Sequence, residues 1–210
     1  MITTKQFQIL TDINLVWKLM TEVYDHEESN GPAQLYEDTD LYFDFRTGSL
    51  DYPLPAGYHF TNPKDNDPLK VARCLWDSFN KWELGEFMNW ETPVKNGGRS
   101  PHELYQNVLG ATLAPAPHAT YDYTTVIADA DDNYVCFAGM WWVPENKLAY
   151  LEPLCTVPEH QHKGLAAAAL SYLEKILRPL GAAVITGGGN EFYRKLGYKG
   201  VHVQGHYVKP

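Results

Sequence analysis

The sequence has few cysteines, no long apolar run and a shortage of basic residues. Its three cysteines, Cys74, Cys136 and Cys155, are too few and too scattered for a disulfide framework. No stretch approaches the roughly 18 apolar residues of a membrane span. The opening residues, MITTKQFQIL, lack the basic and apolar regions of a secretory leader. We therefore expect a cytoplasmic protein without a membrane partner.

The charge balance argues against nucleic acid as a partner. Seventeen Lys and Arg stand against 26 Asp and Glu, a formal net charge of -9, and no basic cluster is segregated along the chain. Such a surface repels a phosphate backbone, whereas it tolerates a small cationic ligand. Because 44% of the residues are hydrophobic and 13% are aromatic, we expect a packed globular domain.

The N-terminal part is expected to be an extension, residues 1–56, packed on a main domain of residues 57–210. Helical spacing of apolar residues predicts a helix over 13–24, and a short strand is predicted at 41–45. The main domain is predicted to open with a strand at 57–61. A helix over 68–80 follows, capped by Asp67, and a long aromatic loop over 81–100 leads into a second helix at 101–110.

From residue 121 onwards the pattern changes to strands. Three β-rich runs separated by the polar turns ADADDN and PENK predict an antiparallel meander, whose last strand covers 148–157. A helix that begins at about Leu165 and stops near Pro179 and Gly181 comes next. A strand at 182–186, a connection through Gly187–Gly189, a short helix and a last strand at 201–208 complete an α/β (α+β) fold.

The junction between the third meander strand and the following helix is a candidate anion site. The residues from Gln161 to Ala166 lie where free backbone N–H groups and the positive end of the helix dipole converge. Gly164 allows a phosphate to approach the main chain closely. Taken alone this pattern is weak, because an ordinary β–α connection has the same composition.

Three segments together resemble the GNAT superfamily of N-acetyltransferases. Gln161-His162-Lys163-Gly164-Leu165-Ala166 is similar to the family's Q/R-x-x-G-x-G/A signature. Glu152-Pro153-Leu154-Cys155-Thr156-Val157-Pro158 resembles the strand before that signature. Asn190–Tyr198 resembles the N-x-x-F-Y-x-x-x-G-F/Y segment after it, with one residue instead of two between Asn190 and Phe192. The resemblance implies the GNAT fold, a mixed and mostly antiparallel central sheet with splayed parallel strands 4 and 5, flanked by helices.

The resemblance also implies acetyl-coenzyme A as cosubstrate. Its pyrophosphate would lie on Gln161, His162, Lys163, Gly164, Leu165 and Ala166, and its pantetheine arm would bond to main-chain groups of Leu154 and Thr156. Asn190 would bond to the coenzyme as well as cap its helix. Ala166 replaces the commoner glycine, and His162 replaces a residue that is often basic. Backbone N–H groups and Lys163 would therefore provide most of the interaction with the pyrophosphate.

Two side chains are assigned chemical roles. An aliphatic ammonium has a pKa of about 10.4, so its free base at pH 7 costs about 4 to 5 kcal/mol and a base is needed. We nominate Glu152, on the strand before the phosphate loop, with a solvated or ion-paired carboxylate as the alternative. Tyr193 matches the family's tyrosine acid, which protonates the departing thiolate; the alternative is a core tyrosine.

Several alternatives stay open at this stage. An acyl-cysteine at Cys155 lacks an evident activating base, and a metal site on Glu159, His160 and His162 lacks placed ligands, so we expect no metal. The leading prediction is acetyl transfer to a primary amine of a small molecule or peptide in a ternary complex. The rival is a non-catalytic module that binds acyl-coenzyme A as a sensor or scaffold. A longer acyl group and a homodimer also remain open.

Overall fold

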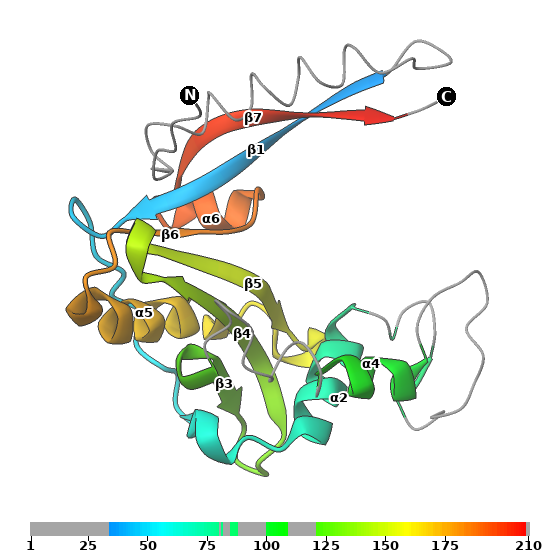
Figure 1. The fold of residues 1–210 in the computed structure, drawn as a ribbon. Helices are drawn as coiled ribbons and strands as arrows, with labels where there is room; N and C mark the ends of the chain where they lie inside the picture. Colours follow the sequence, from blue (N-terminus) through cyan, green and yellow to red (C-terminus); the bar gives the residue numbers. More distant parts are fainter. Residues whose placement is uncertain (1–33, 80, 82–84, 88–99, 109–120, 209–210) are drawn as a thin grey trace, which may run out of the picture. The chain divides into compact units, whose positions relative to one another are not determined.

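The computed structural model describes residues 34–79, 81, 85–87, 100–108 and 121–208 (Figure 1). By contacts the chain divides into two compact units, one of residues 45–185 and one that joins residues 1–44 with residues 186–210. The predicted helix at 13–24 and most of the predicted loop at 81–100 lie outside the described residues. A separate extension at 1–56 stays a prediction, although residues 45–56 group with the larger unit.

The larger unit is built on a sheet with strand order β2-β3-β4-β5-β6. These strands are β2 (His59–Phe60), β3 (Thr125–Ala128), β4 (Tyr134–Val143), β5 (Leu148–Thr156) and β6 (Val184–Thr186). The pairs from β2 to β5 are antiparallel, which confirms the predicted meander. β6 follows a helical crossover and runs parallel to β5. The fold is therefore mixed α/β with a mostly antiparallel sheet, as predicted.

Helices pack against this sheet and begin where the sequence places capping residues (Figure 1). They are α2 (Pro68–Phe79), α4 (Pro101–Asn107) and α5 (Leu165–Leu177). The Asp67 carboxylate accepts the N–H of Leu69 at 2.8 Å, which is the predicted cap of α2. Ser100 and Glu103 form a reciprocal capping box at the start of α4. No helix within the described segments is long and apolar enough to cross a bilayer.

Short 3-10 helices occupy several of the connections. They are η1 (Pro63–Asp65), η4 (Tyr121–Tyr123), η5 (Pro144–Asn146), η6 (Pro158–His160) and η7 (Arg178–Leu180). The main hydrophobic cluster joins α2 and α4 to one face of β4 and β5, through buried Trp76, Phe137 and Cys155 among others. α5 also contacts β3, β4 and β5, and its fully buried Ala169 lets the helix backbone approach the strands closely.

The segment after residue 45 is fastened to α5 by a buried carboxylate. Glu174 is 3% exposed. One of its oxygens accepts the N–H of Leu50 and the other accepts the guanidinium of Arg178, whose Nε lies 3.1 Å away. The Ser171 hydroxyl adds a bond of 2.8 Å to the carbonyl of Leu50. These bonds hold buried Leu50 against α5 and satisfy polar groups that would otherwise be unpaired.

Glu174→Ala is expected to lower the free energy of unfolding by about 3 kcal/mol. The substitution leaves the Leu50 N–H and the Arg178 charge without their buried partner, and breaking such a pair costs more than a surface contact. Urea denaturation measures the change, with exposed Glu145→Ala as the matched control. A loss no larger than that of the control would show that this fastening adds no stability.

The smaller unit pairs strands from the two ends of the chain. β1 (Gln34–Asp44) and β7 (Lys199–Val208) are antiparallel, with a bulge between Asp40 and Leu41. The short helix α6 (Glu191–Lys195) precedes β7. The strand predicted at 41–45 is therefore the end of a longer strand. The rest of β1 was not predicted, because it pairs with β7, which lies far away in the sequence.

Candidate functional site

The loop between β5 and α5 presents unbonded backbone N–H groups. Gly164 caps α5 with φ of 85°, and His162 is also left-handed, with φ of 60°. Within the described part of the chain, no backbone N–H from His162 to Ala167 donates to another protein group. Left-handed residues in such a loop turn successive N–H groups towards one side, and they add to the helix dipole. The arrangement is that of an anion cradle.

The loop is open to solvent at Gly164. A Cβ built on Gly164 would meet no atom within 4 Å, so the position faces open space. Gln161, His162, Lys163 and Gly164 are exposed, whereas Leu165 is buried against the sheet and anchors the first turn of α5. A diphosphate fits this loop, because the main chain donates while the Lys163 ammonium remains exposed to add charge.

β5 carries a bulge directly before the loop. Ala138 pairs with Leu154 and Met140 pairs with Leu151, so Glu152 and Pro153 together oppose the single residue Gly139. A Cβ on Gly139 would lie 2.3 Å from the Glu152 carbonyl oxygen, so only glycine allows this approach. The bulge includes Pro153, which has no N–H to donate to the sheet. Its cross-strand partner Gly139 is a residue that the sequence analysis missed.

Beyond the bulge, the strands of the larger unit that the structure describes leave one side of β5 without a partner. The N–H of Val157 bonds to Val135 of β4, so by strand alternation the main-chain groups of Leu154 and Thr156 point away from β4. On that other side β6 has only three residues and starts beside Lys147, the far end of β5. It is therefore too short to reach Leu154 and Thr156. The Gln161 amide already donates to the Thr156 carbonyl at 3.1 Å.

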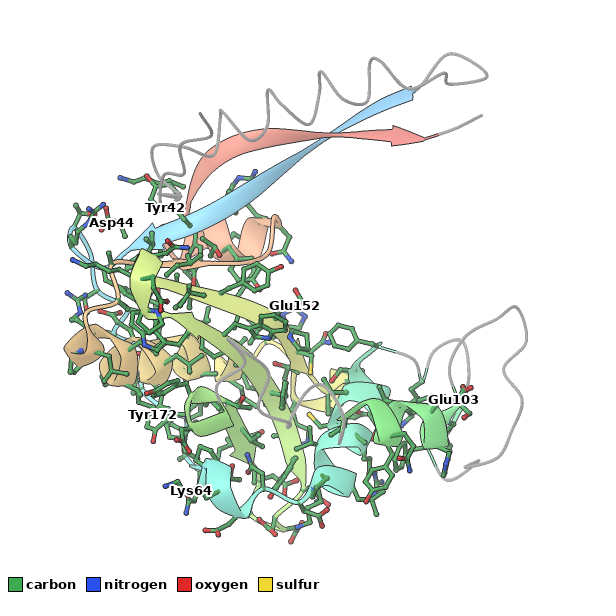
Figure 2. The ribbon with its side chains drawn as sticks, viewed as in Figure 1. Tyr42, Asp44, Lys64, Glu103, Glu152 and Tyr172 are labelled. Atoms are coloured by element: carbon green, nitrogen blue, oxygen red, sulfur yellow. The ribbon has the colours of Figure 1, made fainter. Side chains whose placement is uncertain are left out.

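Glu152 is exposed on the bulge and extends from the middle of β5 (Figure 2). It has no hydrogen bond or ion pair with any described residue. The alternative of a structural ion pair therefore finds no support in the described residues. A carboxylate that is exposed beside a distorted strand is available to accept a proton.

Tyr193 and Asn190 lie in the smaller unit. The Tyr193 ring is 7% exposed and packs against Phe192 and Tyr198 at centroid distances of 5.1 and 5.2 Å. It also rests on Gly188, where a Cβ would lie 1.9 Å from the ring. Gly188 accepts the Leu41 N–H at 3.4 Å, so the glycine segment is bonded to β1. Gly188 is a second residue that the sequence analysis did not single out.

Asn190 performs the capping role predicted from its position. Its side-chain oxygen accepts the N–H of Phe192 at 3.1 Å, at the start of α6. The Arg194 guanidinium donates to the Gly189 carbonyl at 3.0 Å and fixes the same turn. The described bonds therefore account for the local structure at Asn190, while its contact with a coenzyme stays a prediction.

Cys155, the alternative acyl carrier, is buried in the core of the larger unit. Cys155 is 7% exposed and belongs to the cluster beneath α2. A hydrogen bond with Cys155, together with burial, raises the pKa of the Cys74 thiol well above its ordinary value. Burial likewise raises the pKa of Cys136 to about 12. Among the described residues no group of three or more His, Cys, Asp or Glu side chains is arranged to hold a metal ion.

The comparisons with known proteins agree with this geometry. The sequence model of the acetyltransferase (GNAT) family matches residues 76–198. A GCN5-related N-acetyltransferase from Sphaerobacter thermophilus is similar in fold, with a TM-score of 0.60 and 11% identity over 94% of this chain and 57% of that one. Another from Kribbella flavida has a TM-score of 0.52 and 17% identity, over 91% and 63%.

The two solved structures show the fold of this chain, and the family model shows its family. The chain spans less than two thirds of the length of those two structures, and at such identities the likeness shows the fold alone. No curated protein matches the sequence. The family match covers the meander, the phosphate loop and the segment that ends at Tyr198, which is more than half of the chain. The protein therefore belongs to the acetyltransferase (GNAT) family.

Proposed function

We propose that the protein is an N-acetyltransferase that moves an acetyl group from acetyl-coenzyme A to a primary amine by direct transfer. The observation that carries the proposal is the set of N–H groups from His162 to Ala167, which have no described protein acceptor and lie in a loop that is exposed at Gly164. This loop follows a bulged strand whose main chain at Leu154 and Thr156 points away from β4, on the side where β6 is too short to reach. These features suit a diphosphate with an extended amide-containing arm.

The chain's own residues would bind and orient the coenzyme. The main chain from Gln161 to Ala166, with Lys163, would hold the diphosphate, and Leu154 and Thr156 would bond to the pantetheine amides. When bound, acetyl-coenzyme A supplies an activated acetyl thioester, whose carbon–sulfur bond breaks as a carbon–nitrogen bond forms to the amine. Backbone N–H groups at the bulge would stabilise the oxyanion.

Three proton movements accompany the transfer. Glu152, directly or through water, would take the first proton from the ammonium, since its free base is scarce at pH 7. Tyr193 would give a proton to the departing thiolate and recover one from the nitrogen, directly or through water, as the amide forms. The assignment of Tyr193 rests on the similarity of Asn190–Tyr198 to the family segment. Asn190 is proposed as a further contact to the coenzyme. The proposed reaction uses no metal ion.

Gly164→Ala is expected to weaken coenzyme A binding at least tenfold. The φ of 85° would be strained for alanine, so the loop that presents the N–H groups would change its conformation. Isothermal calorimetry with coenzyme A measures the dissociation constant. Gly181→Ala is the matched control, because its φ is 93° and its Cβ would also meet no atom, at the opposite end of α5. No binding heat with the unaltered protein would overturn the proposal.

Release of free thiol separates catalysis from a sensor role. An enzyme liberates coenzyme A from acetyl-coenzyme A only when a suitable amine is present, and the acetylated amine appears by mass spectrometry. A sensor or scaffold binds the coenzyme with the same calorimetric signature but releases no thiol with any amine. The first outcome supports the proposed reaction and the second replaces it with the rival function.

A further inference from the structure

Two large aromatic rings remain exposed on the sheet of the larger unit. Trp141 of β4 and Tyr150 of β5 are cross-strand partners, 41% and 42% exposed. Their ring centroids lie 6.4 Å apart with an interplanar angle of 75°. The neighbouring Trp142 is 7% exposed, so alternation places one tryptophan in the core and the other on the surface. Paired exposed rings of this size are characteristic of binding surfaces.

These rings lie on the sheet face that α2 covers only in part. Phe137, four residues before Trp141 on β4, packs in the cluster beneath α2. Residues separated by an even number on a strand share a face, so Trp141 continues the same face beyond the end of that cluster. The described helices therefore leave this end of the face open to solvent, next to the bulge.

Glu152 lies beside the aromatic pair. Along β5, Ala149 and Leu151 are buried while Tyr150 and Glu152 are exposed, so the last two project to the same side. Two strand residues span about 7 Å. Glu152 has no hydrogen bond or ion pair with a described residue, and the chain as a whole carries a charge of -9. An exposed carboxylate two residues along the strand from one of a pair of aromatic rings complements an ammonium linked to an apolar ring.

We propose that Trp141, Tyr150 and Glu152 form the acceptor site and select a primary amine joined by a short alkyl chain to an aromatic ring. This inference rests on the proposed function, because it deepens that function by naming a substrate class. The acceptor ring contacts Trp141 and Tyr150, and its ammonium approaches Glu152 beside the bulge. A polyamine carries extra charges that the rings do not satisfy, and a small alkylamine lacks the apolar area.

The test compares two amines that differ only by the ring, 2-phenylethylamine and ethylamine, with spermidine as a third. Coenzyme A release gives kcat and KM for each. The unaltered protein is expected to favour 2-phenylethylamine over ethylamine at least tenfold in kcat/KM. Trp141→Ala and Tyr150→Ala are expected to reduce this preference to about threefold or less by raising KM, with kcat and coenzyme A affinity nearly unchanged. Phe79→Ala, which removes a 54% exposed ring from α2, is the matched control.

The outcomes separate this inference from the proposed function. Equal or better turnover of ethylamine or spermidine, or a ring preference that survives both substitutions, overturns the inference while acetyl transfer stands. If no amine is acetylated, binding of 2-phenylethylamine is measured by calorimetry. Binding that Trp141→Ala abolishes then supports the site and counts against the reaction, whereas absence of binding overturns the inference as well.

Discussion

Tyr193→Phe is expected to lower kcat for acetyl transfer by about 10² to 10⁴-fold, the usual contribution of a positioned acid. The ring itself should stay in place, since its contacts with Phe192, Tyr198 and Gly188 do not need the hydroxyl. Coenzyme A affinity should therefore change by no more than about twofold. Steady-state thiol release and calorimetry measure the two quantities on the same preparation.

Tyr198→Phe provides the control for this prediction. Tyr198 is 4% exposed and belongs to the same aromatic cluster, so the variant removes a second buried hydroxyl from the same neighbourhood. Its kcat should remain close to that of the unaltered protein. Unchanged turnover in Tyr193→Phe, or an equal loss in both variants, would show that Tyr193 is not the acid.

Gly188→Ala tests the position of the Tyr193 ring without removing its hydroxyl. Its Cβ would overlap the Tyr193 ring, and φ of 71° adds strain for alanine. The ring must move, so kcat should fall even though the hydroxyl is retained. A folded Gly188→Ala protein with full activity would show that the position of the Tyr193 ring does not limit the reaction.

Local patterns were sufficient to predict most elements of the larger unit. The Asp67-Pro68 start and the apolar stripe of α2 lie within one segment, and β4 coincides with the apolar run YVCFAGMWWV. The position of the loop from Gln161 to Ala166 was predicted for the same reason, because Gly164 follows a strand and precedes a helix. Its binding of a diphosphate stays a prediction. Each of these signals depends on neighbours in the sequence, which a single chain displays directly.

What the sequence did not reveal depends on distant partners. β1 was predicted only at 41–45, since its other residues gain their strand conformation by pairing with β7. Gly139 is necessary because Glu152 approaches it across the sheet, and Gly188 because Tyr193 covers it. His162 is left-handed, with φ of 60°, a conformation that histidine adopts more often than most residues but that its type alone does not predict.

Gly139→Ala is expected to lower the free energy of unfolding by about 3 kcal/mol. The new Cβ would lie 2.3 Å from the Glu152 carbonyl oxygen, 3.0 Å from its carbon and 3.2 Å from the Phe137 ring. Two of these atoms are backbone, so no side-chain rotation relieves the overlap and β5 must move. Urea denaturation measures the loss.

The same movement would reach the proposed site, because the bulge sets the direction of Glu152 and of the main chain at Leu154. In the absence of urea, the variant should therefore bind coenzyme A more weakly and acetylate more slowly than the unaltered protein at the same concentration of folded molecules. Gly181→Ala, whose Cβ meets no atom, should retain both properties. If Gly139→Ala were as stable as the unaltered protein, β5 could accommodate a side chain at the bulge, and the close contact would not be what fixes Glu152.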